Sequence, residues 1–197
     1  MEAKYRERQE ELKDSLKNKQ NKSSIDENKD FKMFRSKNYF ELPIPKYLQL
    51  VLSDSINFSF QRPLEKRVTL ETNKQFQIVI TIQPKRSTLS QNSVFQVSTD
   101  VLDKLRKLNE ETMRHAMPTF IGWENYKLLR TTISTGTNGL GYNYILTNYE
   151  FDVNAEKFYS KLYMYPLENK IIRVQYYFPP ESAEDVDISA TNTNLFE

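Results

Sequence analysis

The chain has 197 residues, of which 38% are hydrophobic, 13% aromatic and 27% charged, with a formal net charge of +2. It contains no cysteine and one histidine, which excludes disulfides, thiol nucleophiles and multi-histidine metal cages. No apolar run reaches the ~20 residues needed to cross a bilayer, and the small net charge gives no general affinity for nucleic acid. We therefore expect no cofactor, no metal site and no transmembrane segment.

Residues 1–37 are rich in charged and amide side chains and poor in apolar ones. A helix over residues 1–20 would bury almost nothing, so the composition predicts a polar tether that is partly helical or disordered. Residues 1–20 also lack the apolar stretch of a secretory signal. Two interpretations stay open. The protein is either cytoplasmic, or the soluble part of an exported cell-envelope or periplasmic lipoprotein whose leader and lipid anchor lie upstream.

Residues 38–180 have the patterning of a single folded domain. Apolar side chains alternate with polar ones over 56–60 and 76–82, which predicts two strands. A long helix is predicted over 100–117, because Pro118 forbids its continuation. The apolar stripe of this helix comprises Val101, Leu102, Leu105, Leu108 and Met113.

Four further β-patterned runs, rich in Tyr, Phe, Ile, Val and Thr, follow the helix. They are 126–134, 142–151, 157–165 and 171–178. Short turns between successive strands favour antiparallel pairing, so we expect an α+β fold. Its single, mainly antiparallel sheet would have about six or seven strands, with the helix packed across one face. Residues 181–197 contain five acidic and no basic side chains, which predicts a flexible acidic tail.

Three of the four glycines lie in the segment Gly136–Gly141. A phosphate-binding loop would need a lysine or a following helix, whereas this segment leads into a strand pattern. The spacing therefore predicts a hairpin turn with positive φ.

Strand 157–165 alternates between an apolar face and a tyrosine-rich face. If the helix covers the apolar face, the tyrosines lie on the uncovered one. Such a face has three interpretations: solvated cross-strand pairs, a protein-binding surface, or a platform for RNA or single-stranded DNA bases. The protein-binding interpretation adds the glycine loop, and its residues are Tyr159, Lys161, Tyr163, Tyr165, Asn138, Leu140 and Tyr142.

His115 is the one histidine, at the expected end of the long helix. A protonated imidazole there interacts favourably with the negative end of the helix dipole. A general base in a hydrolase is the alternative, and it would need a nucleophile close in space. No catalytic residue is assigned.

The order of elements resembles the PsbP-like domains, a group that includes DcrB-type lipoproteins and the nuclear import factors that bind Ran. The resemblance begins at Tyr39–Pro45 and continues through the strand 76–82, the helix and the Gly136–Gly141 turn to Pro179-Pro180. The tryptophan usual in the opening motif is missing. The resemblance implies a non-enzymatic domain that binds another protein or assists an assembly, such as an immunity or secretion-accessory lipoprotein.

Overall fold

The computed structural model describes residues 30–36, 38–61, 76–116, 126–153 and 155–196. The contacts divide the chain into two units, residues 1–31 and 32–197, and the domain discussed below is the second unit. Most of the expected tether therefore lies outside the described residues.

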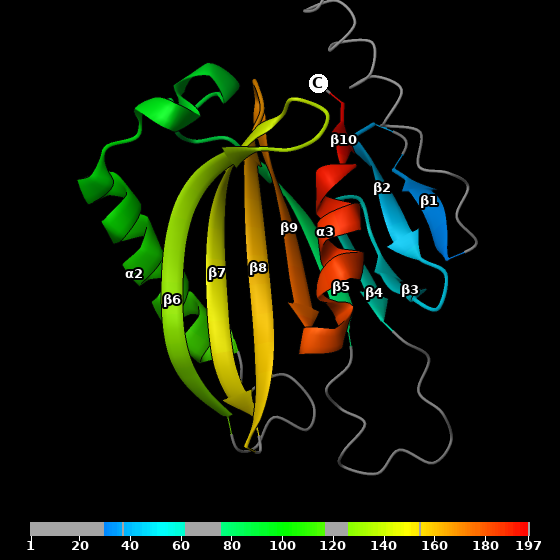
Figure 1. Ribbon diagram of the computed structural model, residues 1–197. Coiled ribbons are helices and arrows are strands. Elements are labelled where there is room, and N and C mark those ends of the chain that lie inside the picture. The colour runs from blue at the N-terminus through cyan, green and yellow to red at the C-terminus, as the bar shows by residue number, and fades with distance from the viewer. Residues whose placement is uncertain (1–29, 37, 62–75, 117–125, 154, 197) are drawn as a thin grey trace, which may run out of the picture. The chain divides into compact units, whose positions relative to one another are not determined.

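A seven-stranded antiparallel sheet forms the centre of the domain (Figure 1). The spatial order is β3-β4-β5-β9-β8-β7-β6, and every neighbouring pair is antiparallel. In the order of the chain, the strands are β3 (Gln49–Ser53), β4 (Asn57–Gln61), β5 (Gln77–Pro84), β6 (Tyr126–Thr137), β7 (Asn143–Val153), β8 (Glu156–Pro166) and β9 (Lys170–Phe178). The predicted α+β fold with an antiparallel sheet is confirmed.

The long helix α2 (Thr99–Ala116) follows a 3-10 turn, η2 (Gln91–Gln96), and packs on one face of the sheet at β6. Met113 enters the core formed with side chains of β6 to β9. Asn109 Nδ2 donates a hydrogen bond to Thr147 Oγ1 on β7, at 2.9 Å. The predicted helix is confirmed, but its predicted stripe is partly wrong, because Val101 is 46% exposed and Leu108 57%. Neither α2 nor the other described α-helix, α3 (Ala183–Thr191), has the length and apolar character that a membrane crossing requires.

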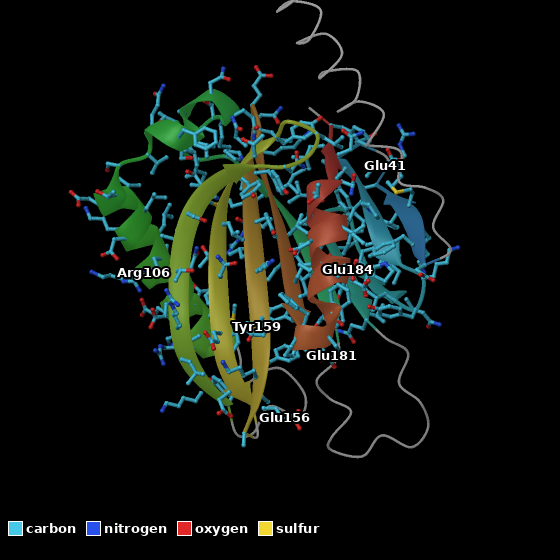
Figure 2. The ribbon with its side chains drawn as sticks, in the orientation of Figure 1. Glu41, Arg106, Glu156, Tyr159, Glu181 and Glu184 are labelled. Carbon is cyan, nitrogen blue, oxygen red and sulfur yellow. The ribbon has the colours of Figure 1, made fainter. Side chains whose placement is uncertain are left out.

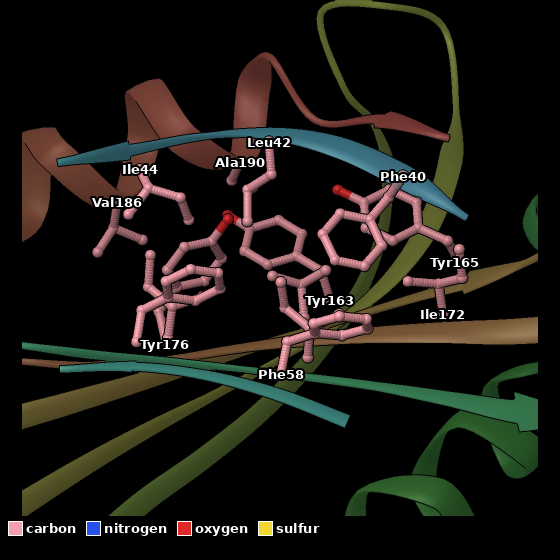
Figure 3. Packing of buried hydrophobic residues seen from close by; sticks show 14 of the residues in the cluster. Phe40, Leu42, Ile44, Phe58, Tyr163, Tyr165, Ile172, Tyr176, Val186 and Ala190 are labelled. Atoms are coloured by element: carbon pink, nitrogen blue, oxygen red, sulfur yellow. The ribbon is translucent and has the colours of Figure 1, made fainter. Parts of the chain in front are cut away.

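The opposite face of the sheet is covered by a second layer, which the sequence pattern did not predict (Figure 1). Its parts are β1 (Phe31–Arg35), β2 (Phe40–Pro45), η4 (Pro180–Ser182), α3 (Ala183–Thr191) and β10 (Asn194–Leu195). The small sheet has the order β1-β2-β10, and α3 packs on β2. Figure 3 shows side chains of β2 and α3 meeting those of the large sheet.

The expectation of a flexible acidic tail over 181–197 is wrong. Within α3, Glu184 and Asp185 lie in the first turn, where carboxylates stabilise the helix dipole. Val186 and Ala190 are four residues apart and both are buried, so the helix has an apolar face that stabilises it by packing. The acidic side chains occupy the other positions.

Four polar contacts hold this layer in place. The buried hydroxyl of Ser189 donates to the carbonyl oxygen of Pro43 at 2.7 Å and lies 3.1 Å from the hydroxyl of Tyr176. Lys161 Nζ pairs with Asp187 at 2.7 Å. The hydroxyl of Tyr47 donates to the carboxylate of Asp185.

The substitution Leu195→Ala tests whether the C-terminal segment belongs to the core. Leu195 is 3% exposed, and we expect the free energy of unfolding to fall by about 2–5 kcal/mol, as for other buried leucines. Chemical denaturation followed by circular dichroism measures the change. The matched control Leu108→Ala, at an exposed site on α2, should change stability by less than about 0.5 kcal/mol. Equal effects of the two substitutions would show that the segment is not part of the core.

Candidate partner-binding surface

Strand β8 sends alternate side chains to the two faces of the large sheet, as predicted. Phe158 and Leu162 join the core beneath α2. Tyr163 and Tyr165 join the other core, beneath α3 and β2. The tyrosine face is therefore the face that the second layer covers in part.

The expectation that Tyr163 and Tyr165 lie on an uncovered face is wrong. Tyr163 is 6% exposed and Tyr165 is fully buried, and Figure 3 shows both rings in the core that includes Phe40 and Leu42 of β2. Ring contacts hold them in place, because the ring of Tyr144 lies 5.0 Å from that of Tyr163 and 5.7 Å from that of Tyr165, both edge-on. Neither ring can stack on a nucleic acid base without unpacking this core.

The buried phenols have strongly raised pKa values. Burial disfavours the phenolate and raises the pKa of Tyr163, and it raises the pKa of Tyr165 well above its ordinary value of 10.0. Among the described residues, the hydroxyl of Tyr165 has no hydrogen-bond partner. The apolar surroundings of these phenols indicate a structural role.

Tyr159 and Lys161 lie where the covered part of this face meets an open part. Both are half-buried, and Lys161 Nζ lies 5.9 Å above the ring of Phe178 besides pairing with Asp187. Figure 2 shows Tyr159 on β8, beside the helix that carries Glu184. These contacts hold the lysine in a defined position at the edge of α3.

The open part of this face lies on β7 and β6. Leu146 and Asn148 are only half-buried, although they point to the same face as the buried Tyr163. Lys157 Nζ and Glu150 form an ion pair at 3.2 Å across β8 and β7. The open part thus combines aliphatic, aromatic and charged side chains on regular strands.

The loop between β6 and β7 borders the open part, and Asn138 organises it. The Asn138 side chain is buried, with its Oδ1 accepting the N–H groups of Leu140 and Tyr142, each at 3.0 Å. Its Nδ2 donates to the carbonyl oxygen of Thr193 at 2.7 Å. Asn138 is therefore a structural residue, and Leu140, which is 42% exposed, is the apolar side chain that the loop presents.

Two glycines allow this loop its conformation. Gly141 has a φ of +91°, which glycine adopts without strain, so the predicted positive-φ turn is confirmed. At Gly139, a Cβ atom would lie 2.7 Å from Thr191 Cγ2 and 2.9 Å from the Thr191 carbonyl oxygen. The Gly139 N–H donates to that carbonyl oxygen at 2.9 Å. The loop is thereby attached to the C-terminal end of α3.

His115, the candidate general base, lies in the last turn of α2. His115 is exposed, and its Nδ1 lies 2.8 Å from the carbonyl oxygen of Glu111. The nearby carboxylate of Glu110 is paired with Arg106 and Arg114, and the hydrogen bond from Arg114 lowers its pKa. The described residues contain no group of three side chains that could hold a metal ion.

The α2 side of the sheet carries a pocket of about 630 Å³. It lies between the η2–α2 segment and the ends of β7, β8 and β9. Its apolar lining includes Val101, Leu105, Ile145, Met164 and Ile171. This site could not be predicted from the sequence, because its residues come from four separated segments and carry no motif.

No family model and no curated protein match the chain. A structure from Bacteroides thetaiotaomicron is 12% identical, with a TM-score of 0.47 over 84% of this chain and 48% of that one. This chain thus spans about half the length of that protein.

Cyanobacterial PsbP from Synechocystis is 14% identical, with a TM-score of 0.47, over 85% of this chain and 93% of that one. The Saccharomyces cerevisiae Ran-binding protein Mog1p is 9% identical, with a TM-score of 0.39, over 82% of this chain and 86% of that one. The second and third belong to the group that the sequence resembles, and the likeness concerns the fold alone.

A spectroscopic titration of the tyrosines tests the burial of the phenols in both cores, beneath α2 and beneath α3 and β2. Burial strongly raises the folded-state pKa of five phenols, namely Tyr149 and Tyr177 beneath α2 and Tyr163, Tyr165 and Tyr176 on the tyrosine face. Unfolded, they titrate near pH 10, so their contribution to stability is complete below about pH 10 and falls as the pH rises further. Ultraviolet absorbance should show that these phenols ionise only in a cooperative step that coincides with unfolding.

The same titration in denaturant is the control. All 12 tyrosines should then ionise in one transition near pH 10, the value for an exposed phenol. If all 12 ionised near pH 10 in the folded protein, with circular dichroism unchanged, the tyrosine face would be open to water.

Proposed function

We propose that this domain is a non-catalytic accessory module that binds another protein. The surface we assign is the open part of the tyrosine face with its bordering loop, and we refer to it as the β6–β8 surface. It comprises Leu140, Tyr142, Leu146, Asn148, Tyr159 and Lys161. Tyr163, Tyr165 and Asn138 support it from below or behind and are not offered as contact residues.

The observation that carries the proposal is the half-burial of Tyr159 and Lys161 at the edge of α3. Tyrosine gives a large contact area at small cost in conformational entropy, and its hydroxyl pairs with polar groups at the rim of an interface. Lys161 is already ordered by Asp187, so less side-chain entropy is lost when a partner binds. Both residues stand on the same regular strand, β8, which fixes their relative positions.

A second part of the proposal concerns where in the cell the domain acts. In it, the domain is the soluble part of an exported lipoprotein of immunity or secretion-accessory type, tethered by residues 1–37. Its support is the polar composition of that segment, and not the geometry of the folded domain. Fractionation of cells that express the natural gene, followed by detergent extraction of the membranes, tests it. Recovery of the protein in the soluble cytoplasmic fraction would contradict the tether.

Site-specific photo-crosslinking in the native cell tests the β6–β8 surface. A benzophenone amino acid replaces Tyr159, and the matched control replaces Phe95, an exposed aromatic residue on η2. We expect a discrete protein adduct from position 159 and none from position 95. Leu140→Arg should weaken the adduct by about tenfold, because a charge at an apolar contact costs about 1.4 kcal/mol or more.

Two outcomes would contradict the proposal. Equal adducts from both positions would indicate non-specific contact. A nuclease-sensitive adduct from position 159 would indicate a nucleic acid, although the rings of Tyr163 and Tyr165 are not accessible for stacking.

A further inference from the structure

The loop between β6 and β7 fastens the C-terminal segment to the large sheet. Figure 1 shows this loop extending from the ends of the two strands toward β10. The Gly139 N–H donates to the carbonyl oxygen of Thr191 at 2.9 Å, and Asn138 Nδ2 donates to that of Thr193 at 2.7 Å. Because α3 ends at Thr191, two adjacent residues of the loop hold the point where the helix ends.

A third hydrogen bond joins the same loop to β10. The hydroxyl of Tyr142 donates to the carbonyl oxygen of Leu195 at 2.8 Å, and the Leu195 side chain is buried in the core beneath α3 and β2. We refer to the three hydrogen bonds, from Asn138, Gly139 and Tyr142, as the C-terminal clamp. All three acceptors are main-chain oxygens of residues 191–195, so the clamp is closed only while that segment is packed on the sheet.

The clamp contains the one Asn-Gly pair in the sequence, Asn138-Gly139. Asparagine is chemically labile, most of all before glycine, whose missing Cβ lets its nitrogen approach the asparagine side chain. In this reaction the Gly139 nitrogen forms a bond to Asn138 Cγ, the Cγ–Nδ2 bond breaks, and Nδ2 leaves as ammonia with the proton of the Gly139 nitrogen. Water then opens the cyclic imide at either of its two carbonyl carbons, which leaves aspartate or isoaspartate at position 138.

The closed clamp holds the atoms that this reaction must move. The attacking nitrogen of Gly139 donates its proton to Thr191, and the leaving Nδ2 of Asn138 is bound to Thr193. Oδ1 of the same side chain accepts two further N–H groups of the loop, each at 3.0 Å. Asn138 is also only 9% exposed, which keeps water and base away from it. Deamidation therefore requires the clamp to open first.

Neither product of the reaction fits the closed clamp. Aspartate would place an oxygen where Nδ2 stands, 2.7 Å from the carbonyl oxygen of Thr193, so that two buried acceptors would face each other without a proton. Isoaspartate adds a methylene group to the backbone next to Gly139. That glycine has no room to shift, because even an added Cβ atom would lie 2.7 Å from Thr191 Cγ2.

We propose that Asn138-Gly139 is a deamidation site that opens the C-terminal clamp irreversibly. The reaction takes place when the segment 191–195 leaves the sheet, and its product prevents the segment from packing back in the same way. The loop that presents Leu140 and the layer that covers Tyr163 are altered together. This chemistry needs only water and does not depend on the function proposed for the β6–β8 surface.

Peptide mapping by mass spectrometry tests the first step. The full chain is incubated folded and in denaturant at the same pH and temperature, and then digested with pepsin in acid. We expect deamidation at position 138 to be slower in the folded chain by at least about tenfold, equivalent to an opening free energy of about 1.4 kcal/mol or more. In the folded chain, Leu195→Ala should raise the rate at least about tenfold by loosening the segment, and the exposed-site control Leu108→Ala should not change it.

Hydrogen exchange tests the second step. Deamidated wild-type chain is separated by ion exchange, which detects its added negative charge, and is compared with intact chain and with Asn138→Asp. We expect faster amide exchange over 183–195 in both altered forms and unchanged exchange over α2 (Thr99–Ala116), which the clamp does not touch. Use of the deamidated chain keeps the test decisive where the substituted chain fails to fold.

Three results would overturn the proposal. They are equal deamidation rates at position 138 in the folded and denatured chain, equal effects of Leu195→Ala and Leu108→Ala, and intact exchange protection over 183–195 in the deamidated chain. Photo-crosslinking from position 159 is unaffected by any of them, so the two proposals fail separately.

Discussion

Apolar side chains on both faces of the large sheet require a cover on each face, and this constraint determines the rest of the domain. On one face, Phe58, Ile80, Val174 and Tyr163 stand side by side across four strands. These rings and branched chains are buried only because α3 and β2 lie over them. The C-terminal segment is therefore part of the core, and Ser189 links it to both partners, through Pro43 of β2 and Tyr176 of β9.

The two covering layers are each smaller than the sheet, and they leave different parts of it open. The layer of α3 and β2 leaves much of β6 and β7 uncovered, which produces the β6–β8 surface. On the other face, α2 lies on β6, and the strands farther from it carry polar side chains. There, Gln77 Nε2 donates to Ser59 Oγ at 3.1 Å, and Gln175 Nε2 donates to Ser160 Oγ at 3.2 Å. In each pair the serine is buried, and the hydrogen bond satisfies its hydroxyl group. The pocket on this face lies between the η2–α2 segment and the ends of β7, β8 and β9.

The elements with one strong periodicity could be predicted from the sequence. Pro118 and the helical spacing of apolar residues indicated α2, and the period-two alternation indicated β4 to β9. The helix α3 was missed because only Val186 and Ala190 mark its buried face, while its acidic residues suggest a solvated tail. The short strand β3 was missed for a different reason, since all of its side chains are exposed and no alternation can show. The strand β2 contains two prolines, which usually argue against a strand.

The candidate site was predicted only in part, for reasons that lie in the chemistry of tyrosine. Alternation placed Tyr159, Lys161, Tyr163 and Tyr165 correctly on one face, but it could not show how far the second layer extends along β8. A phenol ring suits a core as well as an interface, so residue type did not separate the buried pair from the half-buried Tyr159. The position of α3 decides between them. Asp187 of α3 pairs with Lys161, so the boundary between core and surface on this face of β8 lies at this ion pair. Tyr163 and Tyr165 lie on the core side of the boundary and are buried, whereas Tyr159 lies on the other side and is half-buried.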